Sequence, residues 1–169
     1  SDPDVPFDIT DVGLMTLPPE ELIMGATENL LMNGCIDRDM NLTEFGIMIS
    51  QFTALPIHHA TLLAFSPWFG CTEEVAILIA LFKEGYAHRL LRKDMIGFRS
   101  KNKGLISDFV NIVELYKYSR AINTISSDIT KPHKTDKVNG NIMKPRDIDK
   151  VEDGIMKLKI DMIYSGLLV

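Results

Sequence analysis

The sequence has few cysteines and lacks the short motifs of most enzyme classes. Its 169 residues include two cysteines, Cys35 and Cys71, too few for a disulfide framework or a four-cysteine zinc site. No stretch fits the phosphate loop GxxxxGK[ST], and the motifs GxSxG, HExxH and CxxC are missing too. We therefore expect a reducing compartment, and no catalytic site, metal ion or cofactor in this chain.

Long apolar runs and leader-like features are also missing. The longest apolar stretch, residues 75–82, falls far short of the roughly 20 residues that cross a bilayer. The first ten residues lack an initiator Met, a basic region and an apolar region, so they do not resemble a signal peptide. We expect an intracellular chain, nuclear or cytoplasmic, without a membrane partner, and interpret it as a piece of a longer polypeptide.

Positive charge is nearly absent from the first half of the chain. Residues 1–82 carry twelve carboxylates and one base, Arg38, whereas residues 83–169 carry seventeen Lys and Arg against eleven Asp and Glu. Bases are densest in residues 83–103. Only the second half is therefore suited to a polyanion, although a solvated surface or loop has the same composition.

Local patterns predict two helices joined by a short hairpin in the first third. Residues 18–34 begin with two Pro and two Glu, which suit a first helical turn, and end in Gly34, which suits a left-handed stop. Residues 35–42 fit strand, polar turn and strand, and Thr43 is placed to cap the next helix. We interpret residues 1–56 as a winged-helix domain of three helices with a small β-hairpin.

Residues 57–169 have helical periodicity in separate segments, which predicts a helical bundle. Two helices meet at GCTEE, where Thr72 is the expected cap and Pro67 is expected to stop or kink the first helix. Helical spacing returns over residues 105–120 and again from Pro145, with Gly154 as a weak point. The polar segment 126–141 predicts a flexible loop. The predicted fold is mainly α, a winged helix followed by a bundle.

Several side chains have both a functional and a structural interpretation. His58 and His59 are neighbours, about 100° apart on a helix, which is poor geometry for binding one metal ion. The pair Glu73 and Glu74 suits a helix N-terminus better than an acid–base pair. Four aromatic residues could stack on bases but are expected to pack in the core: Trp68, Phe69, Tyr116 and Tyr118.

An ordered series of short motifs runs across residues 7–74. The elements are Phe7 and Asp8, Pro18 and Pro19, Leu30, Leu31 and Gly34, Asp37 and Asp39, Leu42, Thr43 and Gly46, Phe52, Pro56, and Gly70 to Glu74. This series resembles the helicase-associated region of DEAH-box and RNA-helicase-A type RNA helicases, in a divergent form. The resemblance covers residues 7–120 well and 141–160 weakly, because the family's Trp-Cys pair before Arg146 is missing.

The resemblance implies a C-terminal accessory fragment of an ATP-dependent DEAH-type RNA helicase. The winged helix, residues 1–56, would join the motor domains to a ratchet-like bundle, residues 57–169, that forms part of the single-stranded RNA channel. ATP and Mg²⁺ would belong to the upstream motor domains of the same chain, where NTP hydrolysis takes place. A glycine-rich activator peptide is a further partner, on the winged helix. The expected RNA-binding residues are Arg99, Lys101, Lys103, Arg120, Lys144 and Arg146.

Other classes of function stay open. A helical protein-docking adaptor would bind no nucleic acid at all. A stand-alone winged-helix regulator of duplex DNA would need a basic recognition helix, but Glu44 is the only charged residue of segment 43–52. An independent enzyme with an unrecognised site is a third alternative.

Overall fold

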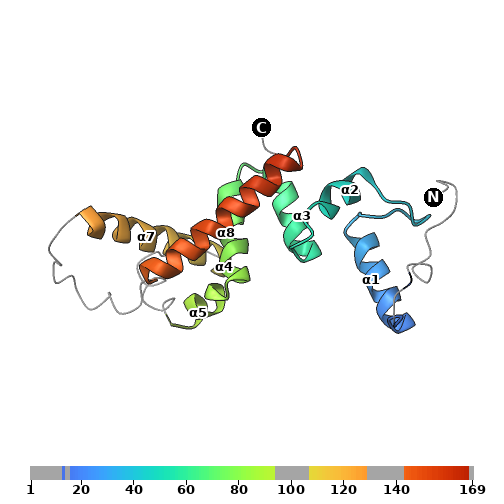
Figure 1. The fold of residues 1–169 in the computed structure, drawn as a ribbon, viewed down its shortest axis with the longest axis horizontal. Helices are drawn as coiled ribbons and strands as arrows, with labels where there is room; N and C mark the ends of the chain where they lie inside the picture. Colours follow the sequence, from blue (N-terminus) through green and yellow to red (C-terminus); the bar gives the residue numbers. More distant parts are fainter. Residues whose placement is uncertain (1–12, 14–15, 94–106, 129–142, 168–169) are drawn as a thin grey trace. The chain divides into compact units, whose positions relative to one another are not determined.

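The protein is mainly α-helical, as predicted. A computed structural model describes residues 13, 16–93, 107–128 and 143–167. These residues form seven α-helices and no strand, with one isolated antiparallel bridge between Ile36 and Leu42 (Figure 1). The chain divides into two compact units, residues 1–50 and 51–169. The domain boundary that we place after residue 56 stays a prediction.

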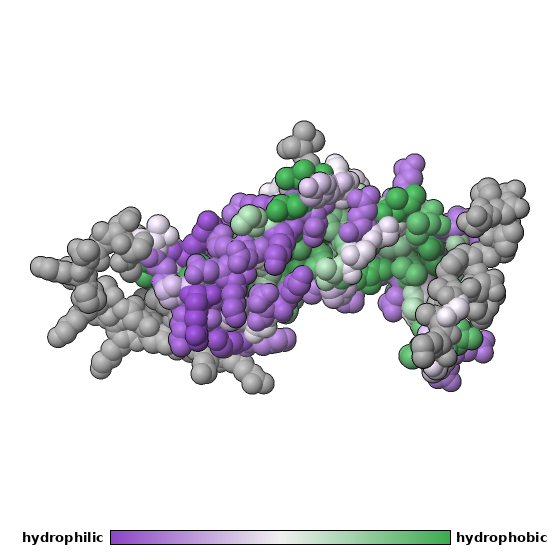
Figure 2. All heavy atoms as spheres, in the orientation of Figure 1, coloured by the Kyte–Doolittle hydropathy of each residue, from purple (hydrophilic) through white to green (hydrophobic). Residues whose placement is uncertain are grey.

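Unit 1 contains two helices in its described part, α1 (Glu20–Met32) and α2 (Glu44–Ser50). Helix α1 follows the Pro pair, has two glutamates in its first turn, and is followed by Gly34 at φ 70°. This start and stop are the ones that the sequence predicts. Helix α1 buries none of its residues, and hydrophobic residues appear on the surface around α2 and the turn before it (Figure 2).

The predicted β-hairpin between α1 and α2 is wrong in the described residues, which form a hydrogen-bonded turn. The carboxylate of Asp37 accepts the backbone N–H of Asp39 at 2.9 Å and of Asn41 at 2.8 Å. The hydroxyl of Thr43 donates to the Gly34 carbonyl at 2.7 Å and accepts the Gly46 N–H at 2.9 Å, which is the predicted cap of α2. One backbone bond crosses on each side of the bridge, from Asp37 N–H to the Asn41 carbonyl and from Thr43 N–H to the Cys35 carbonyl. The ladder does not extend, because Asn41 N–H bonds to the Asp37 carboxylate and Cys35 N–H to the Leu30 carbonyl.

Unit 2 is organised around helix α4 (Thr72–Lys83). The other helices of its described part are α3 (Ile57–Phe65), α5 (Tyr86–Lys93), α7 (Asp108–Asp128) and α8 (Pro145–Tyr164). Each of them contacts α4 (Figure 1). Gly154, predicted as a weak point of α8, lies within the unbroken helix. A Cβ there would lie 3.3 Å from the Ala80 Cβ, so the glycine permits a close α4–α8 contact.

Local signals in unit 2 have mixed outcomes. Helix α3 ends two residues before Pro67, which confirms the predicted stop. Thr72 does not cap α4, because Cys71 occupies the cap position and the Thr72 hydroxyl lies 3.3 Å from the Ser66 hydroxyl. No helix in the described part of the chain is long and apolar enough to span a bilayer.

Helix α7 continues to Asp128, so residues 126–128 of the predicted loop are helical, and residues 129–141 lie outside the described part. The polar residues at its end do not break it. Side chains of Ser119, Asn123 and Thr124 bond to carbonyls one turn earlier, at 2.8, 2.8 and 3.1 Å. Hydroxyl and amide groups satisfied in this way are compatible with a helix.

Two glycines of unit 1 make a matched test of its packing. An added Cβ at Gly46 would lie 2.0 Å from the Cys35 carbonyl oxygen, whereas one at Gly25 would meet nothing within 4 Å. We expect Gly46→Ala to destabilise unit 1 by about 2 to 3 kcal/mol. Gly25→Ala should stabilise α1 by up to about 1 kcal/mol. The stability of unit 1 can be followed by the rate at which a thiol reagent labels the buried Cys35 in a Cys71→Ser background.

Labelling should be faster in Gly46→Ala and no faster in Gly25→Ala. Equal labelling rates in the two variants would contradict the close approach of α2 to Cys35.

Candidate nucleic-acid interface

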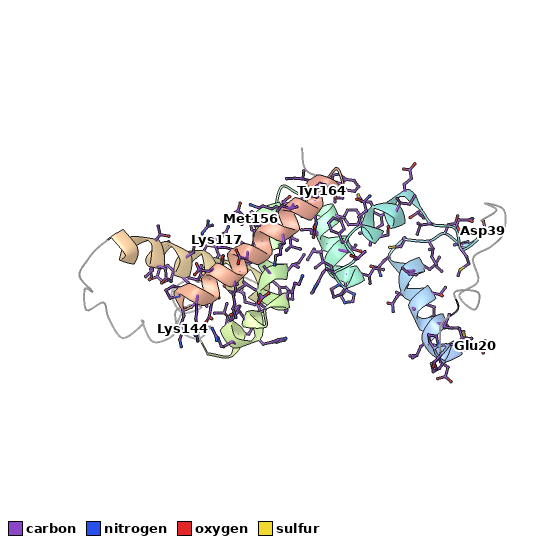
Figure 3. The ribbon with its side chains drawn as sticks, viewed as in Figure 1. Glu20, Asp39, Lys117, Lys144, Met156 and Tyr164 are labelled. Carbon is purple, nitrogen blue, oxygen red and sulfur yellow. The ribbon has the colours of Figure 1, made fainter. Side chains whose placement is uncertain are left out.

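Three of the six predicted RNA-binding residues lie in the described part of the chain. Arg120 is on α7, Lys144 is the residue before α8, and Arg146 is in the first turn of α8. Figure 3 shows Lys144 at the start of α8, at the opposite end from Tyr164. Arg99, Lys101 and Lys103 lie outside the described residues. The candidate interface is therefore the start of α8 with the neighbouring part of α7.

Arg120 is already paired within the bundle. Its Nε lies 3.1 Å from Glu152 Oε1, an oxygen that also accepts the hydroxyl of Tyr116 at 2.5 Å. Tyr116 is fully buried, and its pKa is raised by burial and by Glu152. The hollow beside Arg120, about 340 Å³, is also lined by Glu152 and Asp149. An RNA phosphate at Arg120 would compete with a carboxylate.

Lys144 and Arg146 are better placed to bind an anion. Lys144 is exposed and forms no ion pair with any described residue. Arg146 Nε lies 3.8 Å from Asp147 Oδ1, at the edge of ion-pair range, and its side chain is 77% exposed. The positive end of the α8 dipole lies at the same place. Of the predicted RNA-binding residues that the structure describes, these two are the most accessible to an anion.

Asp147 joins α5 to the start of α8. Arg89 Nη2 donates to its Oδ2 at 3.0 Å, and the Tyr86 hydroxyl donates to its Oδ1 at 3.2 Å. The Arg89 guanidinium also lies 5.0 Å from the centre of the Tyr86 ring. The hydrogen bond from Arg89 is the main cause that lowers the pKa of the nearly buried Asp147 carboxyl, with Tyr86 adding to it against burial. This contact holds α5 beside Lys144 and Arg146.

The structure adds lysines that the prediction omitted. Lys83, Lys150 and Lys157 line a hollow of about 220 Å³ on α4 and α8. Arg146, Lys150 and Lys157 are spaced i, i+4 and i+11, so helical periodicity was a signal for them. Three carboxylates also line this hollow, Glu84, Asp153 and Asp161, so its positive and negative charges balance. It is therefore a weaker candidate for binding an anion than Lys144 and Arg146.

Other candidate residues have different outcomes. Tyr116 is buried as predicted, whereas Trp68, Phe69 and Tyr118 are 73%, 78% and 49% exposed, so core packing is wrong for these three. Glu73 and Glu74 lie in the first turn of α4, where they pair with Lys159 at 3.6 Å and Lys117 at 2.7 Å. No three potential metal ligands gather among the described residues.

The Asp147 contact can be tested through the pH dependence of stability. Because the folded pKa of Asp147 is lowered, its contribution is complete above the unfolded value of about 3.9 and is lost as pH falls through the folded pKa. We expect Asp147→Asn to lose about 1 to 2 kcal/mol at pH 7, since Arg89 is half exposed. The difference from wild type should shrink below about pH 4 in urea denaturation.

Asp149→Asn is the control, because Asp149 is exposed one half-turn farther along α8. A stability loss in Asp147→Asn that stayed constant down to pH 2 would show that the carboxylate charge is not the cause.

Comparison with known proteins gives a partial match. No protein-family model matches the chain. A stretch of 78 residues is 38% identical to a human protein named as a pre-mRNA-splicing factor ATP-dependent RNA helicase, DHX32. The match covers 44% of this chain and 10% of the human protein, so the chain is similar to a small part of that relative. Part of the chain therefore has a distant similarity to an ATP-dependent RNA helicase.

Proposed function

We propose that this chain is the helicase-associated part of a DEAH-type ATP-dependent RNA helicase, where it joins the motor domains and forms part of the path of single-stranded RNA. The observation that carries the proposal is the 38% identity over 78 residues to an ATP-dependent RNA helicase. The ordered motif series from Phe7 to Glu74 supports the same family. The resemblance implies a mainly α-helical fold, and the described residues are mainly α-helical.

Unit 1 takes the place of the winged helix in this proposal, with the wing reduced to the turn at Asp37. Its role is to contact protein. Three apolar side chains of α1 are more than half exposed, Leu22, Met24 and Met32, and residues 1–50 carry ten carboxylates against Arg38. An acidic surface with exposed apolar groups is suited to protein and repels nucleic acid. The partners are the upstream motor domains and a glycine-rich activator peptide.

Unit 2 supplies the cations that face RNA. Lys144 and Arg146 are exposed at the start of α8, and Arg99, Lys101 and Lys103 add to them in sequence. Arg120 contributes less, because Glu152 neutralises it. ATP and Mg²⁺ act in the motor domains of the parent protein, whereas the residues of this chain position the strand.

A protein-docking adaptor is the second candidate, and the exposed apolar side chains of α1 favour it. It differs from the first proposal in one measurable property, since it requires no affinity for RNA. A duplex-DNA regulator has less support, because α2 carries one charged residue, Glu44, and no base.

Charge reversal at the start of α8 tests the RNA contact. We expect Lys144→Glu with Arg146→Glu to weaken binding of single-stranded RNA about tenfold near 100 mM salt, because two phosphate contacts are lost. The slope of log affinity against log salt should fall by about 1.4. Fluorescence anisotropy at several salt concentrations measures both. The control is Lys157→Glu with Lys159→Glu, which makes the same charge change on the same helix with the same spacing.

Equal weakening by the two double variants would contradict a local site at Lys144 and Arg146. Absence of RNA binding by the wild-type chain at low salt would favour the adaptor. The same reversal at Lys101 and Lys103 tests the predicted contacts outside the described residues.

The sequence of the parent protein tests the proposed family directly. We expect a GxxxxGK[ST] loop and an Asp-Glu-Ala-His stretch a few hundred residues before Ser1, because the motor domains must hold ATP and Mg²⁺. Sequencing the complete coding region answers this. A parent protein that has neither motif would exclude the helicase proposal and leave the adaptor.

A further inference from the structure

Four helices of unit 2 each contribute a ring to one cluster around Phe82. The ring centre of Phe82 on α4 lies 6.1 Å from His59 on α3, 5.9 Å from His88 on α5 and 6.1 Å from Phe109 on α7. Core packing does not account for the whole cluster, because Phe109 is 53% exposed and His88 is exposed. The cluster thus presents aromatic surface to solvent where four helices meet.

The two phenylalanines of this cluster border the most basic stretch of the sequence. Phe82 directly precedes residues 83–103, which carry seven Lys and Arg against two carboxylates, and Phe109 follows that stretch by six residues. His88 lies within this stretch, so the rings of the cluster come from before, within and after it in the sequence. The described side chains among these cations are Lys83, directly after Phe82, and Arg89, directly after His88, and rings flanked by cations are suited to a polyanionic ligand.

Helix α5 connects the cluster to the proposed phosphate contacts. His88 meets the Phe82 ring edge to face, with the ring planes at 88°. Its neighbour Arg89 binds Asp147 at the start of α8, the helix end that carries Lys144 and Arg146. Adjacent residues of α5 therefore provide exposed aromatic surface, at His88, and a cation that is paired with α8, Arg89.

We propose that Phe109, Phe82 and His88 form a stacking site for a nucleobase of single-stranded RNA. This inference rests on the proposed function and adds that a base, as well as phosphates, is held. Stacking suits a strand of any sequence, because every base has a π face. Burial and the neighbouring His58 lower the pKa of His59, which favours the neutral form of that ring.

An apolar side chain of a protein partner would also fit against exposed rings. The basic stretch between Phe82 and Phe109 favours the polyanion, and a base-free ligand of equal charge separates stacking from phosphate attraction. The probes are therefore an RNA octamer of adenosine and an octamer of abasic ribose phosphate, both titrated against the full chain by fluorescence anisotropy.

The variant is Phe109→Leu, which keeps an apolar side chain and removes the ring. We expect it to weaken binding of the adenosine octamer by about 5- to 50-fold and to leave the abasic octamer unchanged, since one stacking partner is lost. Phe109→Trp keeps an aromatic surface and should restore binding. The control is Trp68→Leu, a ring that is 73% exposed just after α3, packs on Phe65 and precedes the acidic first turn of α4 in the sequence.

The outcomes separate the two proposals. Wild-type binding that is equal for the two octamers, or unchanged in Phe109→Leu, overturns the stacking site and leaves the phosphate contacts in place. Weakening by Trp68→Leu of the same size also overturns it. A wild-type chain that binds neither octamer at low salt overturns both proposals. If circular dichroism shows that Phe109→Leu is unfolded, Phe109→Trp takes its place in the test. A folded Phe109→Trp variant that no longer binds the adenosine octamer would overturn the inference.

Discussion

The burial of α4 on nearly all sides is the constraint on which unit 2 depends. Six of its twelve residues are buried: Val75, Ala76, Ile77, Ile79, Ala80 and Leu81. A helix that is apolar around most of its circumference is stable in water only when other helices cover it. Helices α3, α5, α7 and α8 do so, and α8 lies close to α4 where Gly154 faces Ala80. The candidate interface is a consequence, since covering α4 brings α5 and the start of α8 together at the contact between Arg89 and Asp147.

Helix ends in this protein could be predicted where one residue sets the backbone. The Pro pair before α1, Gly34 after it and Pro67 after α3 act through their own φ angles or a missing N–H, without distant partners. The hairpin and the end of α7 could not be predicted in this way. There the outcome depends on side chains that bond to backbone groups, as Asp37 does in the turn and Asn123 does in α7.

The candidate site was only partly predictable because sequence identifies charges but not their partners. Lys144 and Arg146 were found as cations and are exposed, whereas Arg120 was found as a cation and is paired with Glu152, a residue 32 positions away. The aromatic cluster had no local signal, since its rings come from four helices. Trp68 shows the converse error, because an aromatic residue after an apolar helix suggests a core that its 73% exposure contradicts.

The two units differ in how their helices are stabilised, and this difference bears on their roles. Helix α1 has 13 residues and buries none of them, and isolated helices of that length are marginal in water. A protein partner that covers Leu22 and Met24 would therefore stabilise helix α1 when it binds. Unit 2 needs no such surface for α4, which its own helices bury. The docking role that we propose for the acidic unit and the ligand-binding role that we propose for unit 2 both agree with one property, the distribution of buried apolar area between the two units.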